Sequence, residues 1–268
     1  MVYHFDALRT YVEETIKKDI LEQKPRPDEL YAPFRYALDT GGKRLRPVLM
    51  LMAYNLFHDD VEQACRPAIA LEVFHNFTLL HDDIMDDSPL RRNKATVHKK
   101  WNANTAILSG DAMMIKAYQF MTDHASTNLA QVLRVFNQIA LDVCEGQQYD
   151  MNYETRQHVS EQEYLYMITL KTSALLAGAM KMGALLANRS ADEAEALYAF
   201  GLNLGLAFQL QDDLLDSFGD KEKFGKRIGG DILANKKTYL LIKAFELAGE
   251  PQQGELERLI SGTQTTTP

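Results

Sequence analysis

The sequence predicts an all-α protein, and three observations lead to that class. Apolar residues recur every three or four positions along nearly the whole chain, which is the period of an amphipathic helix. Clusters of proline and glycine separate these segments. The chain has 268 residues, 46% of them apolar, which is enough to bury a sizeable core. We therefore expect one helical domain over residues 1–268.

The first three helices have clear boundaries. One face of the first helix is apolar, and its residues are Phe5, Leu8, Val12, Ile16 and Ile20. Pro25 and Pro27 close that segment. A second helix ends at Gly41-Gly42, a natural C-cap, and Pro47 lies in the first turn of a third helix.

Helical patterning continues through the rest of the chain. The expected segments are about 66–85, 102–121, 128–148, 161–186 and 192–218. After a basic loop, Asp231 is expected to cap one more helix, which carries Lys236 and Lys237.

Two acidic motifs lie in these helices. Asp82-Asp83-x-x-Asp86 and Asp212-Asp213-x-x-Asp216 have the same internal spacing. The first and last Asp of each motif share one helix face, where like charges repel unless a cation lies between them. Oxygen ligands without a neighbouring Cys or His pair favour Mg²⁺ over Zn²⁺. One copy alone could be a solvated acidic helix end, but two copies indicate a divalent-metal site.

Basic residues follow the first motif. Arg91 and Arg92 come just after Pro89, which is expected to stop the helix. Guanidinium groups bind the same diphosphate oxygens that a metal bridges, so this arrangement suits a diphosphate better than a simple salt bridge. His75 lies two turns before Asp82 on the same face, and we expect it in the site, although a lone His is usually an ordinary core or surface residue.

Two basic loops contain glycine. In the loop of residues 41–47, the glycines would let backbone N–H groups approach a phosphate while Lys43 and Arg46 supply charge. A plain solvated loop could have the same composition. The loop of residues 221–230 could close over an anion.

Polar residues lie within two of the predicted helices. Lys171-Thr172 lies in an apolar run, so Lys171 either reaches the surface or points into a polar cavity. Gln209 lies three residues before Asp212 and therefore on the second acidic face.

Composition excludes several classes of protein. A formal charge of −8 argues against a nucleic-acid partner, which needs a clustered basic surface. No apolar run approaches the ~20 residues of a membrane span, and an N-terminal segment with Asp6, Glu13 and Glu14 is unlike a signal peptide. Cys65 and Cys144 lie in apolar helical segments and are expected to be buried free thiols, which suits a reducing cytoplasm.

Taken together, these motifs resemble those of the trans-isoprenyl diphosphate synthases, the family of farnesyl and geranylgeranyl diphosphate synthases. The resemblance runs from about Gly41 to Lys236 and includes the Gly-Gly-Lys-Arg-x-Arg-Pro loop, both Asp motifs, the double Arg, Lys-Thr and the closing loop. It implies a helical bundle around a deep central cavity, the isoprenoid synthase fold, with the Asp motifs facing each other across its mouth, and a homodimer. It also implies further helices after Pro268, which we expect this sequence to lack.

The resemblance implies a role for each matching residue. Three Mg²⁺ ions are expected at Asp82, Asp86 and Asp212, supported by Asp83, Asp213 and Asp216. The allylic substrate, which is dimethylallyl, geranyl or farnesyl diphosphate, is expected at Arg91, Lys171 and Lys226, with Lys236 approaching as the site closes. Isopentenyl diphosphate is expected at Lys43, Arg46, His75 and Arg92. Lys171, Thr172 and Gln209 are expected to act where the carbocation forms.

The implied reaction is a Mg²⁺-dependent head-to-tail condensation. Divalent ions with Arg and Lys stabilise the leaving diphosphate while an allylic cation forms. The isopentenyl double bond attacks that cation, and a proton then leaves to the released diphosphate. No poised Glu or His is required, and the motifs contain none.

Three other functions fit parts of the sequence. A class I terpene cyclase shares the first Asp motif, but it needs no second diphosphate pocket such as Lys43, Arg46 and Arg92 would make. A phosphohydrolase with His75 and His81-Asp82 as metal ligands leaves the second Asp motif without a role. A non-catalytic partner subunit of a prenyltransferase should have lost one Asp motif, and both are present.

Product length depends on the residues before the first Asp motif. The growing tail is expected to meet Phe77 and Thr78. In the resembling family, a second aromatic beside the first, or a two-residue insertion within the motif, marks farnesyl synthases, and this sequence has neither. We therefore predict a C20 product, geranylgeranyl diphosphate, with C15 farnesyl diphosphate as the near alternative. Phe77 could equally be core packing, with the floor on the helix that carries Met113 and Met114.

Overall fold

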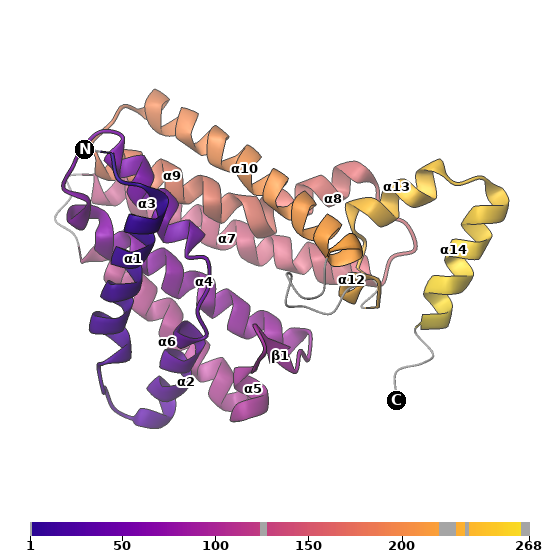
Figure 1. The fold of residues 1–268 in the computed structure, drawn as a ribbon, viewed down its shortest axis with the longest axis horizontal. Coiled ribbons are helices and arrows are strands. Elements are labelled where there is room, and N and C mark those ends of the chain that lie inside the picture. Colours follow the sequence, from indigo (N-terminus) through magenta and orange to yellow (C-terminus); the bar gives the residue numbers. More distant parts are fainter. Residues whose placement is uncertain (1, 124–127, 220–228, 234–235, 264–268) are drawn as a thin grey trace. The chain divides into compact units, whose positions relative to one another are not determined.

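The computed structural model describes residues 2–123, 128–219, 229–233 and 236–263. Nearly all of these residues are helical, which confirms the all-α prediction (Figure 1). The chain divides into two compact units: unit 1 is residues 1–137 and 176–200, and unit 2 is residues 138–175 and 201–268. The single domain over residues 1–268 stays a prediction.

Unit 1 contains the N-terminal helices and one short hairpin. Its elements are α1 (Phe5–Ile16), the π-helical turn η1 (Lys17–Leu21), α2 (Asp28–Asp39), α3 (Leu45–Asn55), the 3₁₀ turn η2 (Val61–Ala64), α4 (Cys65–Met85), β1 (Leu90–Arg91), β2 (Lys94–Ala95), α5 (Val97–Lys100) and α6 (Ala103–Thr122). The first part of α7 (Leu129–Glu154), most of α9 (Ala174–Leu186) and the first part of α10 (Ala191–Phe218) complete the unit.

Helix α4 forms the centre of unit 1. It is apolar nearly all round, and such a helix is stable only when other elements cover it. Phe74 is 1% exposed, and its ring lies 5.3 Å from that of Phe136 on α7. Helix α6 runs beside α4 (Figure 1). A Cβ atom at Gly110 of α6 would lie 2.2 Å from Nε2 of His81, so a side chain at position 110 would displace the His81 ring that lies against α6.

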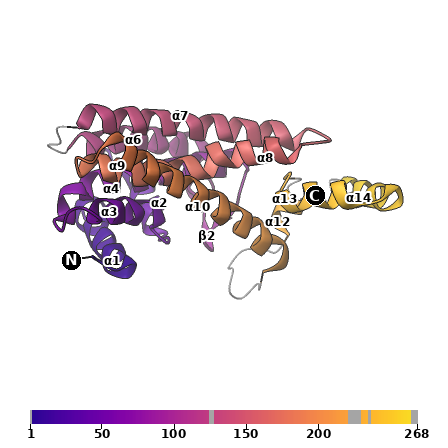
Figure 2. The same ribbon diagram turned by 90° about the horizontal axis from the view of Figure 1, so that it is seen from above.

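Unit 2 is built around a break in a long helical segment. It contains the second part of α7, α8 (Glu161–Ile168), the π-helical turn η3 (Thr169–Ser173), the second part of α10, α12 (Gly230–Leu233), α13 (Tyr239–Leu247) and α14 (Glu250–Thr263). Figure 2 shows α8 alongside the end of α7. Cβ atoms at Gly146 of α7 and Gly205 of α10 would lie 2.3 Å from the Lys171 nitrogen and 2.5 Å from the Ser173 Cα atom. The two glycines therefore hold η3 closely between α7 and α10.

Most predicted helix boundaries agree with the structure, but three features differ. Helix α7, expected over about 128–148, continues to Glu154. The predicted helix over 161–186 is interrupted by η3, so Lys171 and Thr172 lie in a π-helical turn. The prediction that Asp231 caps a helix carrying Lys236 and Lys237 is wrong, because Asp231 lies inside α12, which ends at Leu233. Lys236 and Lys237 are not helical, because Thr238 caps a new helix by accepting a hydrogen bond from the Leu241 nitrogen.

The cysteine prediction is half right. Both thiols are free and Cys65 is buried, but Cys144 is exposed, because it lies on an outward face of α7. Within the described residues, no helix is both long enough and apolar enough to cross a membrane.

Candidate active site

The glycine loop before α3 brings a second arginine against its backbone. Gly41 and Gly42 have φ angles of +80° and +154°, which favour glycine. A Cβ atom at Gly42 would lie 3.0 Å from both terminal nitrogens of Arg92. The Arg92 guanidinium therefore lies against the loop, 50 residues away in sequence, and a side chain at position 42 would displace it.

Arg46 and His75 form a direct pair beside this loop. Arg46 Nη1 donates to His75 Nε2 at 3.0 Å, so Nε2 is the unprotonated nitrogen. Burial, and then the charge of Arg46, lower the pKa of His75 well below its usual 6.5. Burial also lowers the pKa of Arg46, to about 10. Nε of Arg46 is buried, and no other described residue accepts a hydrogen bond from it.

The loop, Arg46, His75 and Arg92 therefore lie together in unit 1. Glu72, 2% exposed, is the buried carboxylate whose charge acts on both Arg46 and Arg92. It is already hydrogen-bonded to Arg44 at 2.7 Å. Arg46 and Arg92 thus share the charge of a carboxylate that already binds Arg44, and a phosphate group would offset their remaining charge.

Arg91 turns to the other side of the chain. Its Nε donates to Asp83 Oδ1 at 2.8 Å, and its Nη2 lies 3.5 Å from Asp82 Oδ2. Burial raises the pKa of Asp83 to about 6, although Arg91 acts in the opposite direction. Arg91 is the last residue of strand β1, and Arg92 begins the turn that follows, with a φ of +52°, so the chain changes direction between them. Arg91 meets the Asp motif, whereas Arg92 meets the glycine loop.

The first Asp motif ends helix α4. Asp82 is half-buried, Asp83 is buried and Asp86 is exposed. The C-terminal end of a helix carries partial negative charge, so carboxylates there are unfavourable unless cations compensate them. Phe77, one turn earlier, is 9% exposed and packs between Phe74 and His81.

Thr78 is half-buried, and its hydroxyl donates to the His75 carbonyl at 2.8 Å. That bond ties the Thr78 side chain to its own helix.

The second Asp motif lies near the end of α10, in unit 2. Asp213 is 3% exposed; it accepts hydrogen bonds from Tyr164 and, at 2.8 Å, from Gln209. Gln209 in turn accepts a hydrogen bond from the Thr172 hydroxyl at 2.9 Å. Burial raises the pKa of Asp213, against the lowering effect of these hydrogen bonds. Thr172, Gln209 and Asp213 therefore form one connected network.

The remaining predicted residues of unit 2 lie around this network. Asp212 is half-buried, and Asp216 accepts a hydrogen bond from the Asp231 nitrogen at 3.1 Å, which ties α12 to α10. Lys171 Nζ donates to Asp150 Oδ2 at 2.5 Å, so the cation points to a carboxylate of α7 rather than to open solvent. Lys43 is exposed and Lys236 is half-buried. Lys226 lies outside the described residues.

Both acidic motifs suit Mg²⁺ by their donor chemistry. Within the described ranges, no three His, Cys, Asp or Glu side chains are grouped as a ready metal site. Mg²⁺ does not require such a group, because it commonly binds through one or two carboxylates, several waters and the substrate's phosphate oxygens. Both motifs lie near the carboxyl ends of their helices, where a cation is favourable.

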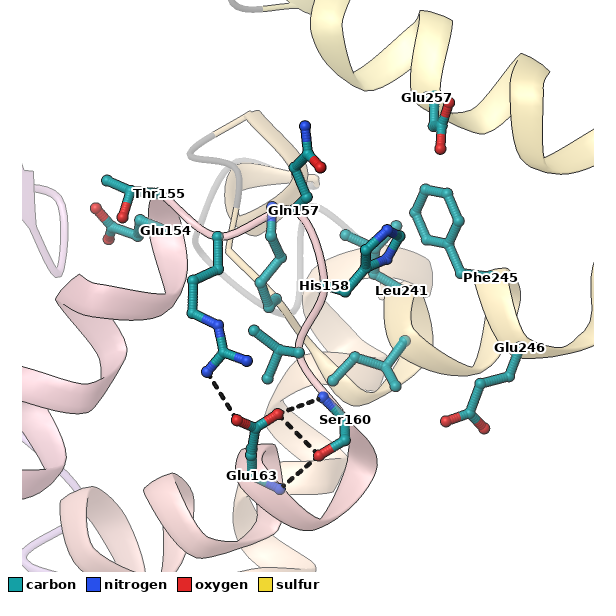
Figure 3. A pocket seen from close by; sticks show the side chains of 14 residues that line it. Glu154, Thr155, Gln157, His158, Ser160, Glu163, Leu241, Phe245, Glu246 and Glu257 are labelled. Carbon is teal, nitrogen blue, oxygen red and sulfur yellow. Dashed lines mark hydrogen bonds and ion pairs between the residues drawn. The ribbon is translucent and has the colours of Figure 1, made fainter.

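A large hollow in unit 2 lies away from these residues. Its volume is about 1040 Å³, and none of the predicted site residues lines it. Glu163 accepts hydrogen bonds from Arg156 and from Ser160 at its edge (Figure 3). These bonds cap the start of α8, so the polar groups there have a structural role.

Several residues that sequence analysis did not single out support the site. Asp150 and Tyr164 hold Lys171 and Asp213, and Gly110, Gly146 and Gly205 allow close helix packing. The signal for the glycines was present in the sequence, since glycine inside a helix usually has a packing reason. Asp150 gave no such signal, because a lone Asp on an amphipathic helix is common.

Fold and site together indicate an enzyme class that handles diphosphates with divalent ions. Residues 27–267 match the family model of polyprenyl synthetases. The chain is 42% identical to a geranylgeranyl diphosphate synthase of Methanosarcina mazei, over 82% of this chain and 69% of that protein. It is 39% identical to a short chain isoprenyl diphosphate synthase of Methanocaldococcus jannaschii, over 95% and 74% of the two chains.

Solved structures agree. A crystal structure of a geranylgeranyl pyrophosphate synthase matches with a TM-score of 0.92 at 51% identity, over 97% of this chain and 78% of that one. The corresponding enzyme of Pyrococcus horikoshii matches with a TM-score of 0.89 at 35% identity, over 97% and 81%. The chain belongs to the polyprenyl synthetase family. It is a prenyltransferase, a short-chain trans-polyprenyl diphosphate synthase whose substrates are isoprenoid diphosphates.

The neutral state of His75 has a measurable effect on stability. Its pKa in the folded protein is below the unfolded value of 6.5, so below about pH 6.5 the unfolded chain binds a proton that the folded chain does not. Relative to a His75→Gln variant, the native protein should therefore lose free energy of unfolding as the pH falls from about 7 to 5, by up to ~1.4 kcal/mol per pH unit. Urea denaturation at several pH values measures this. A constant difference between the two proteins from about pH 5 to 8 would contradict the assignment.

Proposed function

We propose that this enzyme makes geranylgeranyl diphosphate from isopentenyl diphosphate and an allylic diphosphate, and that it holds the two diphosphates in separate pockets. The observation that carries the proposal is that two consecutive arginines contact different parts of the protein. Arg91 contacts Asp82 and Asp83, whereas Arg92 lies against Gly42. One guanidinium is thereby available to a metal-bound diphosphate and the other to a diphosphate without metal.

The pocket around Arg92 suits isopentenyl diphosphate. Its cations are Lys43, Arg46 and Arg92, and its neutral partner is His75. This substrate keeps its diphosphate during the reaction, so the pocket needs to hold and orient that group but not to stabilise a leaving group. Arginine side chains and backbone N–H groups of a glycine loop are sufficient for that purpose.

The acidic motifs suit the allylic diphosphate. We assign Asp82, Asp86 and Asp212 as ligands of three Mg²⁺ ions, with Asp83, Asp213 and Asp216 orienting them. When bound, Mg²⁺ supplies positive charge that stabilises the departing diphosphate. Arg91, Lys171, Lys226 and Lys236 add charge from the protein. Tyr164 and Gln209 fix the rotamer of Asp213, and hence the local geometry of the second motif.

We assign Thr172 and Gln209 to the space where the allylic cation forms. The Thr172 hydroxyl donates a hydrogen bond to Gln209 Oε1, so the oxygen lone pairs of Thr172 can face developing positive charge. The isopentenyl double bond attacks this cation, forming one C–C bond, and the proton lost from the adjacent carbon passes to the released diphosphate. None of these steps requires a histidine or glutamate base.

Kinetics of single variants separate the two pockets. Asp82→Ala and Asp212→Ala should each lower kcat by about three orders of magnitude or more, because leaving-group stabilisation is lost. Arg46→Ala should chiefly raise the KM for isopentenyl diphosphate. The assay contains Mg²⁺, labelled isopentenyl diphosphate and an allylic primer, and removal of Mg²⁺ by EDTA should abolish product. If Arg46→Ala weakened the binding of the allylic substrate alone, the pocket assignment would be wrong.

Phe77 sets the predicted product length. Its ring is almost fully buried, one turn before Asp82, and it packs on Phe74 and His81. Phe77→Ala should remove the barrier that stops the growing tail and lengthen the main product by at least one five-carbon unit. Chromatography of the dephosphorylated products measures this. An unchanged product from a folded Phe77→Ala enzyme places the floor elsewhere, with Met113, 0% exposed on α6, as the next candidate.

We also propose that the enzyme works in the cytoplasm as a homodimer. Two observations support this: both cysteines are free thiols, and α6 exposes Ile107, Leu108 and Ile115. Leu108→Glu should therefore shift the protein from dimer to monomer in light scattering. Leu56→Glu is the control, because Leu56 is 58% exposed and Leu108 is 60% exposed. If the Leu108→Glu variant remained a dimer, the exposed face of α6 would be excluded as the dimer interface.

A further inference from the structure

Arg44 lies in the sequence between Lys43 and Arg46, two of the cations of the isopentenyl pocket, but it binds protein groups instead. Its side chain is 1% exposed. Nη1 donates to Glu72 at 2.7 Å, and Nη2 donates to the Leu38 carbonyl at 2.8 Å. Arg44 is therefore an internal anchor of the glycine loop and not a ligand for substrate.

The first helix supplies the other half of this anchor. Arg44 Nε donates to Glu13 Oε1 at 2.8 Å, and Nη2 lies 3.3 Å from Glu13 Oε2. This bidentate geometry fixes the plane of the guanidinium as well as its position. Glu13 lies on α1, before residue 27, where the match to the family begins.

The anchor holds a backbone conformation that a non-glycine residue does not favour. Arg44 has a φ of +50° and ψ of +34°, in the left-handed region, and it is the residue on which α3 begins. Such a conformation costs of order 1 kcal/mol or more and persists only where the surroundings enforce it. Lys43 precedes Arg44 directly and Arg46 follows two residues later, so the direction of both side chains depends on this residue.

We infer that Glu13 is a positioning residue for the isopentenyl diphosphate pocket. By clamping Arg44 from α1, it holds the loop so that Gly42 lies against Arg92 and Arg46 reaches His75. This inference rests on the proposed function, which assigns that pocket to isopentenyl diphosphate. Glu13 itself touches neither substrate.

Glu13 is a better site for a test than its partners. Removal of Arg44 would leave Glu72 as a buried carboxylate without its cation, and such changes often prevent folding. The side chain of Glu13 is 42% exposed, and its loss leaves Arg44 still bound to Glu72 and Leu38. Glu14, its neighbour, is exposed and lies off this contact, so Glu14→Ala is the matched control.

The experiment measures steady-state kinetics of Glu13→Ala for both substrates. We expect the KM for isopentenyl diphosphate to rise about 5- to 20-fold, while kcat and the KM for the allylic substrate change less than about twofold. Glu13→Gln, which keeps an oxygen acceptor but loses the charge, should show a smaller rise. Glu14→Ala should match the native enzyme.

Arg46→Ala, measured in parallel, distinguishes failure of the pocket assignment from failure of the inference about Glu13. If Arg46→Ala does not raise the KM for isopentenyl diphosphate, the pocket assignment itself fails. If it does but Glu13→Ala does not, or if Glu13→Ala alters both substrates equally, then Glu13 has only a general structural role and the inference is overturned. Thermal denaturation of each variant checks folding, and Glu13→Gln gives the same comparison should Glu13→Ala be unstable.

Discussion

Burial of positive charge around the glycine loop is the constraint on which unit 1 depends. The charge of Glu72 acts on Arg44, Arg46 and Arg92; Glu13 also binds Arg44, but Glu72 cannot by itself neutralise both Arg46 and Arg92. Arg46 contacts a neutral histidine, and its Nε has no acceptor among the described residues. Such an arrangement is unfavourable in isolation and becomes favourable when an anion enters, because the anion restores both the charge balance and the missing hydrogen bonds.

The acidic motifs present the opposite constraint. Carboxylates cluster near the carboxyl ends of α4 and α10, where the helix dipole repels them, and burial raises the pKa of Asp83 to about 6. Arg91 offsets part of this charge. Divalent cations, brought with a diphosphate, would offset the rest. We therefore propose that the metal ions and the allylic substrate bind together at the acidic motifs, and that isopentenyl diphosphate binds without metal.

The sequence was sufficient to predict the parts of this account that depend on local patterns. The spacing of apolar residues predicted the first and last residues of α4 and α10 closely. The repeated Asp spacing pointed to both acidic motifs. The pairing of Lys43 and Arg46 with His75 and Arg92 came from the family resemblance. The structure brings Gly42 against Arg92 and Arg46 against His75, which agrees with that grouping.

The parts that could not be predicted depend on contacts distant in sequence. The residues next to Arg44 do not indicate that its side chain is buried. It is held there by Glu13 on α1 and Glu72 on α4, which are distant in the sequence. The π-helical turn η3 has an ordinary helical pattern; close packing on Gly146 and Gly205 accompanies its shape. Lys236 and Lys237 are not helical, contrary to the prediction, because Thr238 caps the next helix, α13.

The most direct test of two separate diphosphate pockets is a crystal structure with Mg²⁺, isopentenyl diphosphate and an unreactive thio analogue of an allylic diphosphate. The account predicts that isopentenyl diphosphate contacts Arg46 and Arg92 without metal, while the allylic diphosphate contacts Arg91 and the ions at the Asp motifs. A structure in which Arg91 and Arg92 bind the same diphosphate would contradict it.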